Sequence, residues 1–439
     1  MFFDECSKDG FYFIGIGGVS MSALARLLHG RGYAVRGSDM QAGNFTRMLE
    51  REGIRVHIGE EEYISEGTVV YTGAIAEDHP QLLQAKRDGK RLISRPELLG
   101  SIADEFPHVV SVAGCHGKTS TTSMLAHIFS ESGRPFTCHI GGEDLLLGNF
   151  HSTGGEYFLT EACEFKRSFL SIKSEIAIIL NTDLDHTDCY KDEEELFGAY
   201  TAFSRLAKKL VVNADDVRAR TLPHSMSFGL YGGDIRAEKV RCIAEKYSFT
   251  VSEKGIPIVR VKLNCVGKVM IYDALAAYAA ARLLGFSAEE IRRGLEKYRG
   301  VGRRFESVGT LKGVPVVCDY AHHPREIAAV LETARNICSG TVRLVFQPHT
   351  YTRTRDFLSE FVGVLKSAES PIIYKTYAAR EEFDAAGSAF ALISQLPDAV
   401  YAQTPEQLKK RLLDVTQKDD LILVLGAGDI FQITQEILD

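Results

Sequence analysis

Residues 109–122 read VVSVAGCHGKTSTT, and the rest of the chain is organised around this stretch. A β-branched apolar run enters a glycine turn, which is followed by Lys118 and a row of hydroxyl residues. Four apolar residues between 124 and 129 then recur at the spacing of one helix face. This order predicts a strand, a glycine loop and a helix N-terminus, whose backbone N–H groups bind phosphate.

The loop has the pattern Gly-x-x-Gly-Lys-Thr, which is shorter than the usual phosphate-loop signature because Val112 stands where that signature has glycine. Lys118 offers a charge to phosphate and Thr119 offers a hydroxyl to Mg²⁺. The alternative, a glycine turn that merely precedes a helix, leaves Lys118 without a role. The residues predicted to bind nucleotide phosphate are Gly114, Cys115, His116, Gly117, Lys118, Thr119 and Ser120.

Length and composition narrow the class of protein. At 439 residues the chain exceeds the usual size of one core, which predicts two or three domains. A formal net charge of −7 argues against nucleic acid as the main partner. No segment has the roughly 18 continuous apolar residues of a membrane helix, so we expect no membrane partner. Nine cysteines without Cys-x-x-Cys spacing predict reduced thiols and therefore a cytoplasmic location.

The N-terminal third has the pattern of a dinucleotide-type βαβ unit. A buried strand at 11–14 leads into a glycine loop, a helix at 23–30 and a strand at 32–39 that ends in Asp39. Such glycines admit a pyrophosphate, and such an acid binds a ribose hydroxyl. Ser20 replaces the third glycine of the fingerprint, and both a nicotinamide cofactor and a nucleotide-sugar diphosphate fit the pattern.

Two further loops belong to this third. Asn44 and Thr46 follow Asp39, where they either reach a base or sugar or supply turn and N-cap chemistry. A strand at 69–72 precedes another glycine, and the polar segment 101–107 is predicted to be a linker. The candidate residues for a sugar nucleotide are Gly15, Gly17, Gly18, Val19, Ser20, Asp39, Thr46, Thr72, Ala74 and Ile75.

Acidic residues and a histidine follow two strands of the middle third. The strand at 157–160 ends in Glu161, and the strand at 176–180 leads to Asp185, His186 and Asp188. Because the carboxyl ends of parallel strands form the ligand edge, both groups are expected near the phosphates held at Lys118, where they suit Mg²⁺. A helix-capping or core histidine is the alternative for His186.

Beyond this point we predict an antiparallel excursion over 226–266 and helices at 273–284 and 288–298. The last third repeats the strand-and-polar-tip pattern after Arg303 and Arg304. Strands at 315–318, 342–346 and 421–425 predict a third α/β unit with arginines suited to carboxylate or phosphate. Their tips carry Asp319, Tyr320, His322, His323, His349, Thr350, Arg353 and Gly426.

Taken together, these motifs resemble the Mur ligase family nearly end to end. Besides those above, the resemblance is carried by Ser94-Arg95-Pro96-Glu97, Asp319-Tyr320-x-His322-His323-Pro324, Phe346-Gln347-Pro348-His349, Ala379-Arg380-Glu381-Glu382 and Gly426-Ala427-Gly428-Asp429-Ile430. The doubled histidine and the Gln-Pro-His run are typical of the branch that adds L-alanine.

The resemblance implies an α/β fold of three domains. These are a Rossmann-like UDP-binding domain (1–104), a central P-loop ATPase domain with a small antiparallel β excursion (105–302) and a C-terminal Rossmann-like domain (303–439) that closes over the ATP site. It also implies ATP-driven ligation of L-alanine to the lactyl carboxylate of UDP-N-acetylmuramic acid, through an acyl phosphate, by a monomer or homodimer. Two Mg²⁺ ions are expected as cofactors.

The family also implies roles for individual residues. Thr119, Glu161 and His186 would hold Mg²⁺, with Lys118, His186, His322 and Arg353 catalytic. Arg304 and Asp319 would join the ATP site, and Tyr320, His322 and Arg353 would surround the amino acid and the intermediate.

The sequence departs from the family pattern at four places. Cys115 replaces a threonine, Cys163-Glu164-Phe165 replaces Asp-Glu-Ser, and Thr350 replaces an arginine. Most importantly, Val269-Met270-Ile271-Tyr272-Asp273 stands where the family has His-Asn-x-x-Asn, which helps to bind adenine. Two alternatives therefore remain, a recycling ligase that adds a tripeptide and a ligase-like binding protein. A nicotinamide dehydrogenase is disfavoured because it gives Lys118 no role.

Overall fold

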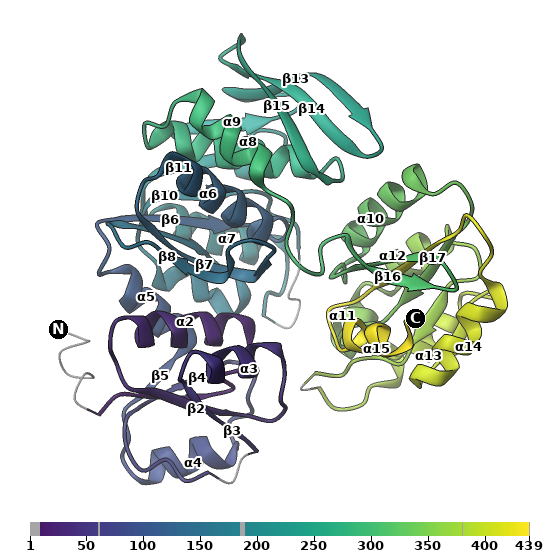
Figure 1. Cartoon of the computed structure of the whole chain (residues 1–439), viewed down its shortest axis with the longest axis horizontal. Coiled ribbons are helices and arrows are strands. Elements are labelled where there is room, and N and C mark those ends of the chain that lie inside the picture. Colours follow the sequence, from purple (N-terminus) through teal and green to yellow (C-terminus); the bar gives the residue numbers. More distant parts are fainter. Residues whose placement is uncertain (1–8, 60–61, 185–188, 380, 439) are drawn as a thin grey trace. The chain divides into compact units, whose positions relative to one another are not determined.

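The computed structural model describes residues 9–59, 62–184, 189–379 and 381–438 (Figure 1). The chain divides into two compact units. Unit 1 comprises Met1–Thr182, Gly198–Arg236 and Asp273–Lys297, and unit 2 comprises Asp183–Phe197, Ala237–Tyr272 and Tyr298–Asp439. None of the helices in the described ranges combines the length and apolar character that a bilayer crossing requires.

The N-terminal part of unit 1 is a parallel sheet of order β3-β2-β1-β4-β5. Its central strand is buried along its whole length, as the apolar run at 11–14 predicts. The strands are β1 Phe11–Ile14, β2 Val35–Asp39, β3 Arg55–Ile58, β4 Thr68–Tyr71 and β5 Leu92–Ser94. The helices are α2 Val19–Gly30, α3 Asn44–Arg51, α4 Pro80–Arg87 and α5 Arg95–Ala103.

Two expected boundaries in this part are wrong. Helix α2 begins at Val19 rather than at 23, because Gly18 is extended and the first turn follows the glycine loop directly. Helix α5 includes Ser101 to Ala103, so the predicted linker is reduced to 104–107. A capping box starts this helix, in which the Ser94 hydroxyl accepts from the backbone of Glu97 and the Glu97 carboxylate accepts from Ser94 N.

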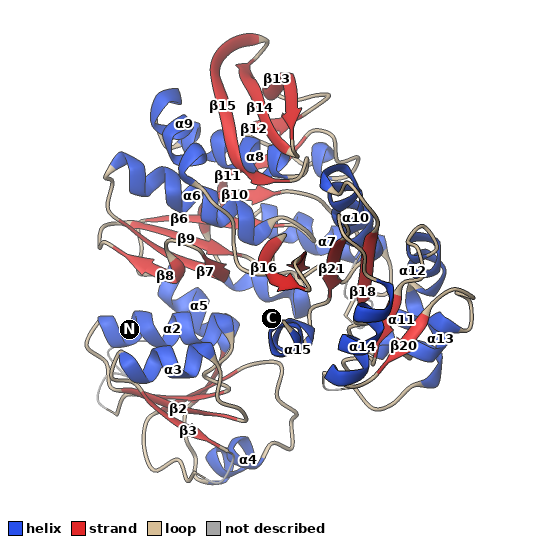
Figure 2. Ribbon diagram, turned by 45° about the vertical axis from the view of Figure 1, so that its right-hand side comes forward, coloured by secondary structure: helices blue, strands red, loops and turns tan. Residues whose placement is uncertain are grey.

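The second sheet, most of which belongs to unit 1, contains the strand order β13-β12-β11-β10-β6-β9-β7-β8, and β13 belongs to unit 2 after Arg236. Figures 1 and 2 show α2 lying between this sheet and the N-terminal sheet, where it packs against β7 and β8. The strands are β6 His108–Ala113, β7 Phe136–Asp144, β8 Gly148–Ser152, β9 Tyr157–Glu161, β10 Ser174–Ile179, β11 Ala207–Asn213, β12 Met226–Gly229 and β13 Ile235–Ile243. The helices of unit 1 are α6 Lys118–Ser132 and α9 Ala288–Lys297, and two further helices, α7 Glu193–Ser204 and α8 Met270–Leu283, begin in unit 2 and end in unit 1.

One element of this region was not predicted, and one expectation needs correction. The element not predicted is the antiparallel hairpin β7–β8, whose turn is held by Asp144 Oδ1 accepting from Leu146 N and Leu147 N. The predicted excursion is antiparallel only in part, because β12 pairs in parallel with β11 and with the start of β13. The antiparallel pair is β14 Lys246–Glu253 with β15 Ile256–Val266, in unit 2.

The C-terminal part of unit 2 is a sheet of order β16-β17-β21-β18-β19-β20, parallel except for β16. Alternate residues of its strands face two apolar layers, one with α10, α12 and α13 and one with α14 and α15. The strands are β16 Glu306–Leu311, β17 Val314–Asp319, β18 Val342–Phe346, β19 Ile372–Tyr374, β20 Val400–Ala402 and β21 Leu421–Leu425. The helices are α10 Pro324–Ile337, α11 Tyr351–Asp356, α12 Leu358–Leu365, α13 Ala389–Ile393, α14 Pro405–Val415 and α15 Ile430–Ile437.

Candidate active site

The predicted phosphate loop joins β6 to α6, and two glycines give it its shape. Gly114 and Gly117 have φ values of 137° and 86°, which residues other than glycine adopt only with strain. A methyl group at Gly114 would also lie 2.9 Å from Leu180 Cβ. Gly117 is the N-cap of α6 and supplies no side chain to its first turn, whose backbone N–H groups are therefore suited to an anion.

Asn181, which follows β10, holds the middle of this loop. Its Oδ1 accepts from His116 N and its Nδ2 donates to His116 O, both at 3.0 Å. Asn181 was not among the residues predicted from the sequence. The signal was its place directly after a buried parallel strand that neighbours β6.

Lys118 is the first residue of α6, and its ammonium group faces Glu164. Nζ lies 3.1 Å from Glu164 Oε1 and 3.0 Å from Oε2, and it also donates to the carbonyls of Gly114 and Cys115. Burial lowers the pKa of Lys118, but the opposing effects of nearby negative groups, led by the Glu164 carboxylate, together outweigh burial and leave that pKa above its usual value. Lys118 therefore stays charged. Glu164 keeps the family's glutamate between the departures at Cys163 and Phe165, and its ion pair with Lys118 was not predicted from the sequence.

Glu161 ends β9 and is one of the predicted Mg²⁺ ligands. Its Oε1 accepts from Gly141 N at 2.5 Å, which fixes the carboxylate against β7. Thr119, on the first turn of α6, is buried. A threonine hydroxyl and a carboxylate are the oxygen donors that Mg²⁺ prefers, so these two residues fit the ion. His186, Asp185 and Asp188 lie outside the described residues, and the described part of the chain holds no cluster of three metal-binding side chains.

Asp273, on α8, lies next to the phosphate loop. Its Oδ1 accepts from Thr121 Oγ1 at 3.3 Å, and a methyl group on Gly117 would lie 2.5 Å from the same oxygen. Asp273 is buried, whereas Val269, which precedes α8, is 49% exposed. Asp273 is one of the positions at which the sequence departs from His-Asn-x-x-Asn. At this position the departure brings a buried carboxylate to the phosphate loop.

The glycine loop of the N-terminal sheet is held by Asp39. Asp39 Oδ2 accepts from Gly17 N at 2.8 Å, and a methyl group on Gly17 would lie 2.8 Å from this oxygen and 2.7 Å from Thr46 Cγ2. The Thr46 hydroxyl accepts from Gly43 N and donates to Gly43 O, which is the capping role left open above. After β4, the Thr72 hydroxyl accepts from Ala74 N at 3.3 Å.

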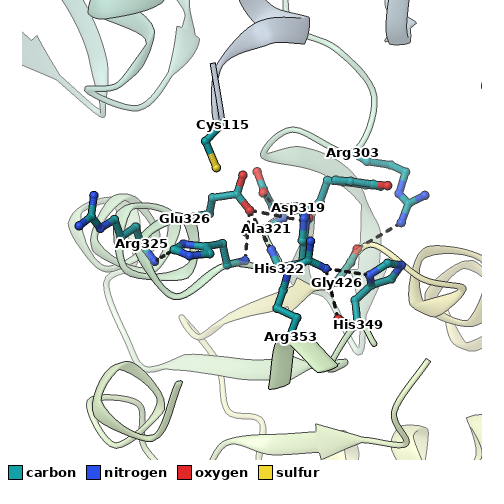
Figure 3. Close-up of polar contacts among 12 residues, drawn as sticks. Cys115, Arg303, Asp319, Ala321, His322, Arg325, Glu326, His349, Arg353 and Gly426 are labelled. Atoms are coloured by element: carbon teal, nitrogen blue, oxygen red, sulfur yellow. Dashed lines mark hydrogen bonds and ion pairs between the residues drawn. The ribbon is translucent and has the colours of Figure 1, made fainter. Parts of the chain in front are cut away.

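The carboxyl ends of β17, β18 and β21 bring together most residues predicted for the amino acid (Figure 3). His322 Nδ1 lies 2.9 Å from Tyr320 O, so Nδ1 carries a proton, and in the neutral ring Nε2 is an acceptor. The His322 ring lies 5.8 Å from the His349 ring. Arg353 is buried and its guanidinium lies 3.2 Å from His349 Nδ1.

Two other predicted residues serve the same edge. Asp319 accepts from Phe305 N and Ala321 N, each at 2.8 Å, and burial raises the pKa of this carboxyl to about 6. The guanidinium of Arg304 lies 5.3 Å from the ring centre of Tyr320. Glu326, which the sequence analysis did not select, accepts from the backbone of both His322 and His323.

Three family models match the chain in succession, the Mur ligase family catalytic domain over 10–107, the Mur ligase middle domain over 112–281 and the Mur ligase glutamate ligase domain over 303–428. The chain belongs to the Mur ligase family.

Among individual proteins, the chain is 38% identical over 437 residues to UDP-N-acetylmuramate–L-alanine ligase of Caldicellulosiruptor bescii, covering 96% of each chain. It is 38% identical over 445 residues to the ligase of the same name from Acetivibrio thermocellus, covering 97% of this chain and 95% of that one.

Solved structures give the same fold. UDP-N-acetylmuramate-alanine ligase MurC from Thermotoga maritima has a TM-score of 0.85 at 25% identity, with 98% of both chains covered. A murein peptide ligase from Psychrobacter arcticus has a TM-score of 0.78 at 22% identity, also with 98% of both covered.

Proposed function

We propose that this chain joins L-alanine to the lactyl carboxylate of UDP-N-acetylmuramic acid at the expense of ATP, in the synthesis of peptidoglycan precursors. The full-length relatives that carry this name support the proposal, and the single structural observation behind it is the Lys118 ammonium at the N-terminus of α6. A glycine loop with a half-buried, charged lysine is suited to a transferring phosphoryl group.

In the first step, a carboxylate oxygen of the sugar attacks the γ-phosphorus of ATP, and the bond to ADP breaks. Lys118 and the N–H groups of α6 would balance the negative charge on the phosphoryl oxygens. Thr119 and Glu161 would hold Mg²⁺, which supplies further neutralisation when bound. We include His186 in this set as the sequence predicts.

In the second step, the amine of L-alanine attacks the acyl carbon, phosphate leaves, and the amine gives up a proton. We assign Arg353 to the carboxylate of the amino acid, since a guanidinium matches a carboxylate in shape and charge. His322 Nε2 is an acceptor and would take the proton from the amine. Tyr320 would line the same site.

The sugar nucleotide would lie on the N-terminal sheet. There the N–H groups of the glycine loop and of the start of α2 would bind the diphosphate, as in other βαβ units. Asp39 and Thr46 would act mainly by holding this loop, because their polar atoms already bond to it and to α3. We further propose that the protein acts in the cytoplasm as a monomer or homodimer.

Phosphate release tests this function. Protein with ATP, Mg²⁺ and UDP-N-acetylmuramic acid should release phosphate when L-alanine is added, and less when glycine or L-serine replaces it. Release only with a tripeptide would identify a recycling ligase instead. Absence of release with every acceptor would contradict all ligase assignments and favour a binding protein.

A further inference from the structure

Buried His139 on β7 lies between two hydroxyl groups that come from distant parts of unit 1. Its Nε2 lies 2.8 Å from Ser20 Oγ, at the start of α2, and its Nδ1 lies 3.0 Å from Thr160 Oγ1, on β9. The side chain is buried, and Thr160 is the strand neighbour of His139 in the register of β7 and β9. His139 has no role in the reaction proposed above.

The neighbours of these hydroxyls decide the direction of each hydrogen bond. Arg95 donates to Ser20 Oγ at 3.3 Å, which leaves the hydrogen of Ser20 available for His139 Nε2. The Thr160 hydroxyl donates to Glu161 O at 3.1 Å, so its oxygen accepts from Nδ1–H. A neutral imidazole meets both demands. Burial, and then the charge of Arg95, lowers the pKa of His139 to about 3, which keeps the ring neutral.

The series of hydrogen bonds that starts at Ser20 ends at the backbone carbonyl of Glu161. The carboxylate of Glu161 is held by β7, the strand that carries His139. Gly141, two residues beyond His139 on β7, donates its N–H to Glu161 Oε1 at 2.5 Å. A methyl group on Gly141 would overlap this carboxylate. Both the backbone and the side chain of Glu161 are therefore positioned by the segment of β7 that contacts Ser20.

We propose that His139 is a positioning residue that couples the two nucleotide sites, so that a nucleoside diphosphate on the glycine loop strengthens the binding of Mg²⁺-nucleotide at Lys118 and Glu161. The proposal rests on the function given above only in assigning one ligand to each loop. A diphosphate bound to the glycine loop restrains Ser20, and through His139 and Thr160 it restrains Glu161. The second ligand then has less disorder to remove.

The test uses UDP and Mg²⁺-ADP, because neither carries the reacting carboxylate or the γ-phosphate. Calorimetry gives the Kd of Mg²⁺-ADP with and without saturating UDP. UDP should lower this Kd about fivefold in the unaltered protein, within the usual range of coupling between sites. The ratio of the Kd of Mg²⁺-ADP without UDP to that with UDP measures the coupling. In His139→Leu this ratio should fall to about one, because both hydrogen bonds of the ring are lost.

A matched control comes from the same interface. Asn149 on β8 donates to Val19 O at 2.7 Å and to Ser22 Oγ at 2.9 Å, and it accepts from Arg26. Asn149→Ala therefore removes hydrogen bonds between α2 and the second sheet without touching the chain to Glu161. It should lower stability and keep the fivefold ratio. Should His139→Leu not fold, Ser20→Ala breaks the chain at its first hydroxyl and should also abolish the ratio.

Absence of coupling in the unaltered protein would overturn the proposal. So would an unchanged ratio in His139→Leu or in Ser20→Ala, or a loss of the ratio in Asn149→Ala equal to that in the histidine variant. Because the measurement needs no turnover, a chain that binds both ligands and couples them but never ligates L-alanine would contradict only the proposed function.

Discussion

Both carboxylate oxygens of Glu164 lie within 3.1 Å of Lys118 Nζ, and the Glu164 side chain is only 1% exposed. A buried acid thus neutralises the lysine of the phosphate loop inside its own domain. Phosphate oxygens that bind Lys118 enter a site where a counter-charge is already present, so the two anions share one cation.

Replacing the lysine should separate the two ligand sites. Lys118→Ala is expected to abolish phosphate release because it removes the charge that faces the phosphoryl group. The Kd of UDP-N-acetylmuramic acid, measured by calorimetry, should change less than about twofold, since the sugar nucleotide is assigned to the N-terminal sheet. Loss of both properties together would contradict this division.

Replacing the acid should make stability depend on nucleotide. Glu164→Gln leaves the buried ammonium without its counter-ion and should lower the free energy of unfolding by about 3 kcal/mol. Mg²⁺-ATP should restore much of this loss, because its phosphates take the place of the carboxylate, and thermal unfolding with and without nucleotide measures the difference. Glu175→Gln, which breaks a partly exposed pair with His108, is the control and should cost far less. If nucleotide raised the unfolding temperature of Glu164→Gln by no more than it raises that of the unaltered protein, this explanation would be contradicted.

Gly117 should tolerate no side chain. Gly117→Ala combines a φ of 86° with a methyl group 2.5 Å from Asp273 Oδ1, so we expect loss of nucleotide binding as well as of stability. Gly133, at the other end of α6, has a φ of 73° and open space around it. Gly133→Ala should cost about 1 kcal/mol of stability and leave the Kd of Mg²⁺-ATP unchanged. Equal loss of binding in both variants would refute the steric argument.

The carboxylate of Asp273 should weaken the binding of ATP in the unaltered protein. Its buried carboxylate lies beside Gly117, and repulsion between this charge and the phosphates costs binding free energy. Asp273→Asn keeps an oxygen for Thr121 and removes the charge, so the Kd of Mg²⁺-ATP should fall about fivefold to tenfold. The Kd of UDP, measured in parallel, should not move. An unchanged or weaker affinity for ATP would show that the carboxylate serves the nucleotide in another way.

The pH dependence of stability should report Asp319. Its pKa is about 6 in the folded chain and near 4 when unfolded, so the folded state binds more protons between these values. Stability from this group is therefore complete at low pH and declines as pH rises from about 4 to about 6, by about 3 kcal/mol at most. Asp319→Asn should lack this decline, so the difference in unfolding free energy between the two proteins should change over that range. A constant difference from pH 4 to pH 7 would contradict the raised pKa.

Local order in the sequence was enough to predict the strand–glycine–helix units. The phosphate loop, the glycine loop after β1 and the polar tips of β17, β18 and β21 were all predicted, because apolar runs and glycines act over a few residues. The β7–β8 hairpin was missed. Its Gly141-Gly142 pair suggests a loop, yet these glycines allow the close approach of Glu161 from the neighbouring strand.

The sequence did not predict which charged and polar side chains contact one another. Glu164 follows β9 and Lys118 begins α6, 46 residues earlier, and nothing in either local pattern indicates that the two meet. His139 has the sequence surroundings of an ordinary strand residue. Only the parallel register of β7 and β9 and the packing of α2 on β7 bring Thr160 and Ser20 to its two ring nitrogens.

By itself, the sequence determined the order of the α/β units, the phosphate loop around Lys118 and, by resemblance, the Mur ligase family. The tertiary structure decided which side chains share a charge or a proton, including Lys118 with Glu164 and His139 with Ser20. The physical reason is one of range. Backbone conformation responds to neighbours along the chain, whereas ion pairs and hydrogen bonds form between atoms about 3 Å apart in space, at whatever distance they lie in sequence.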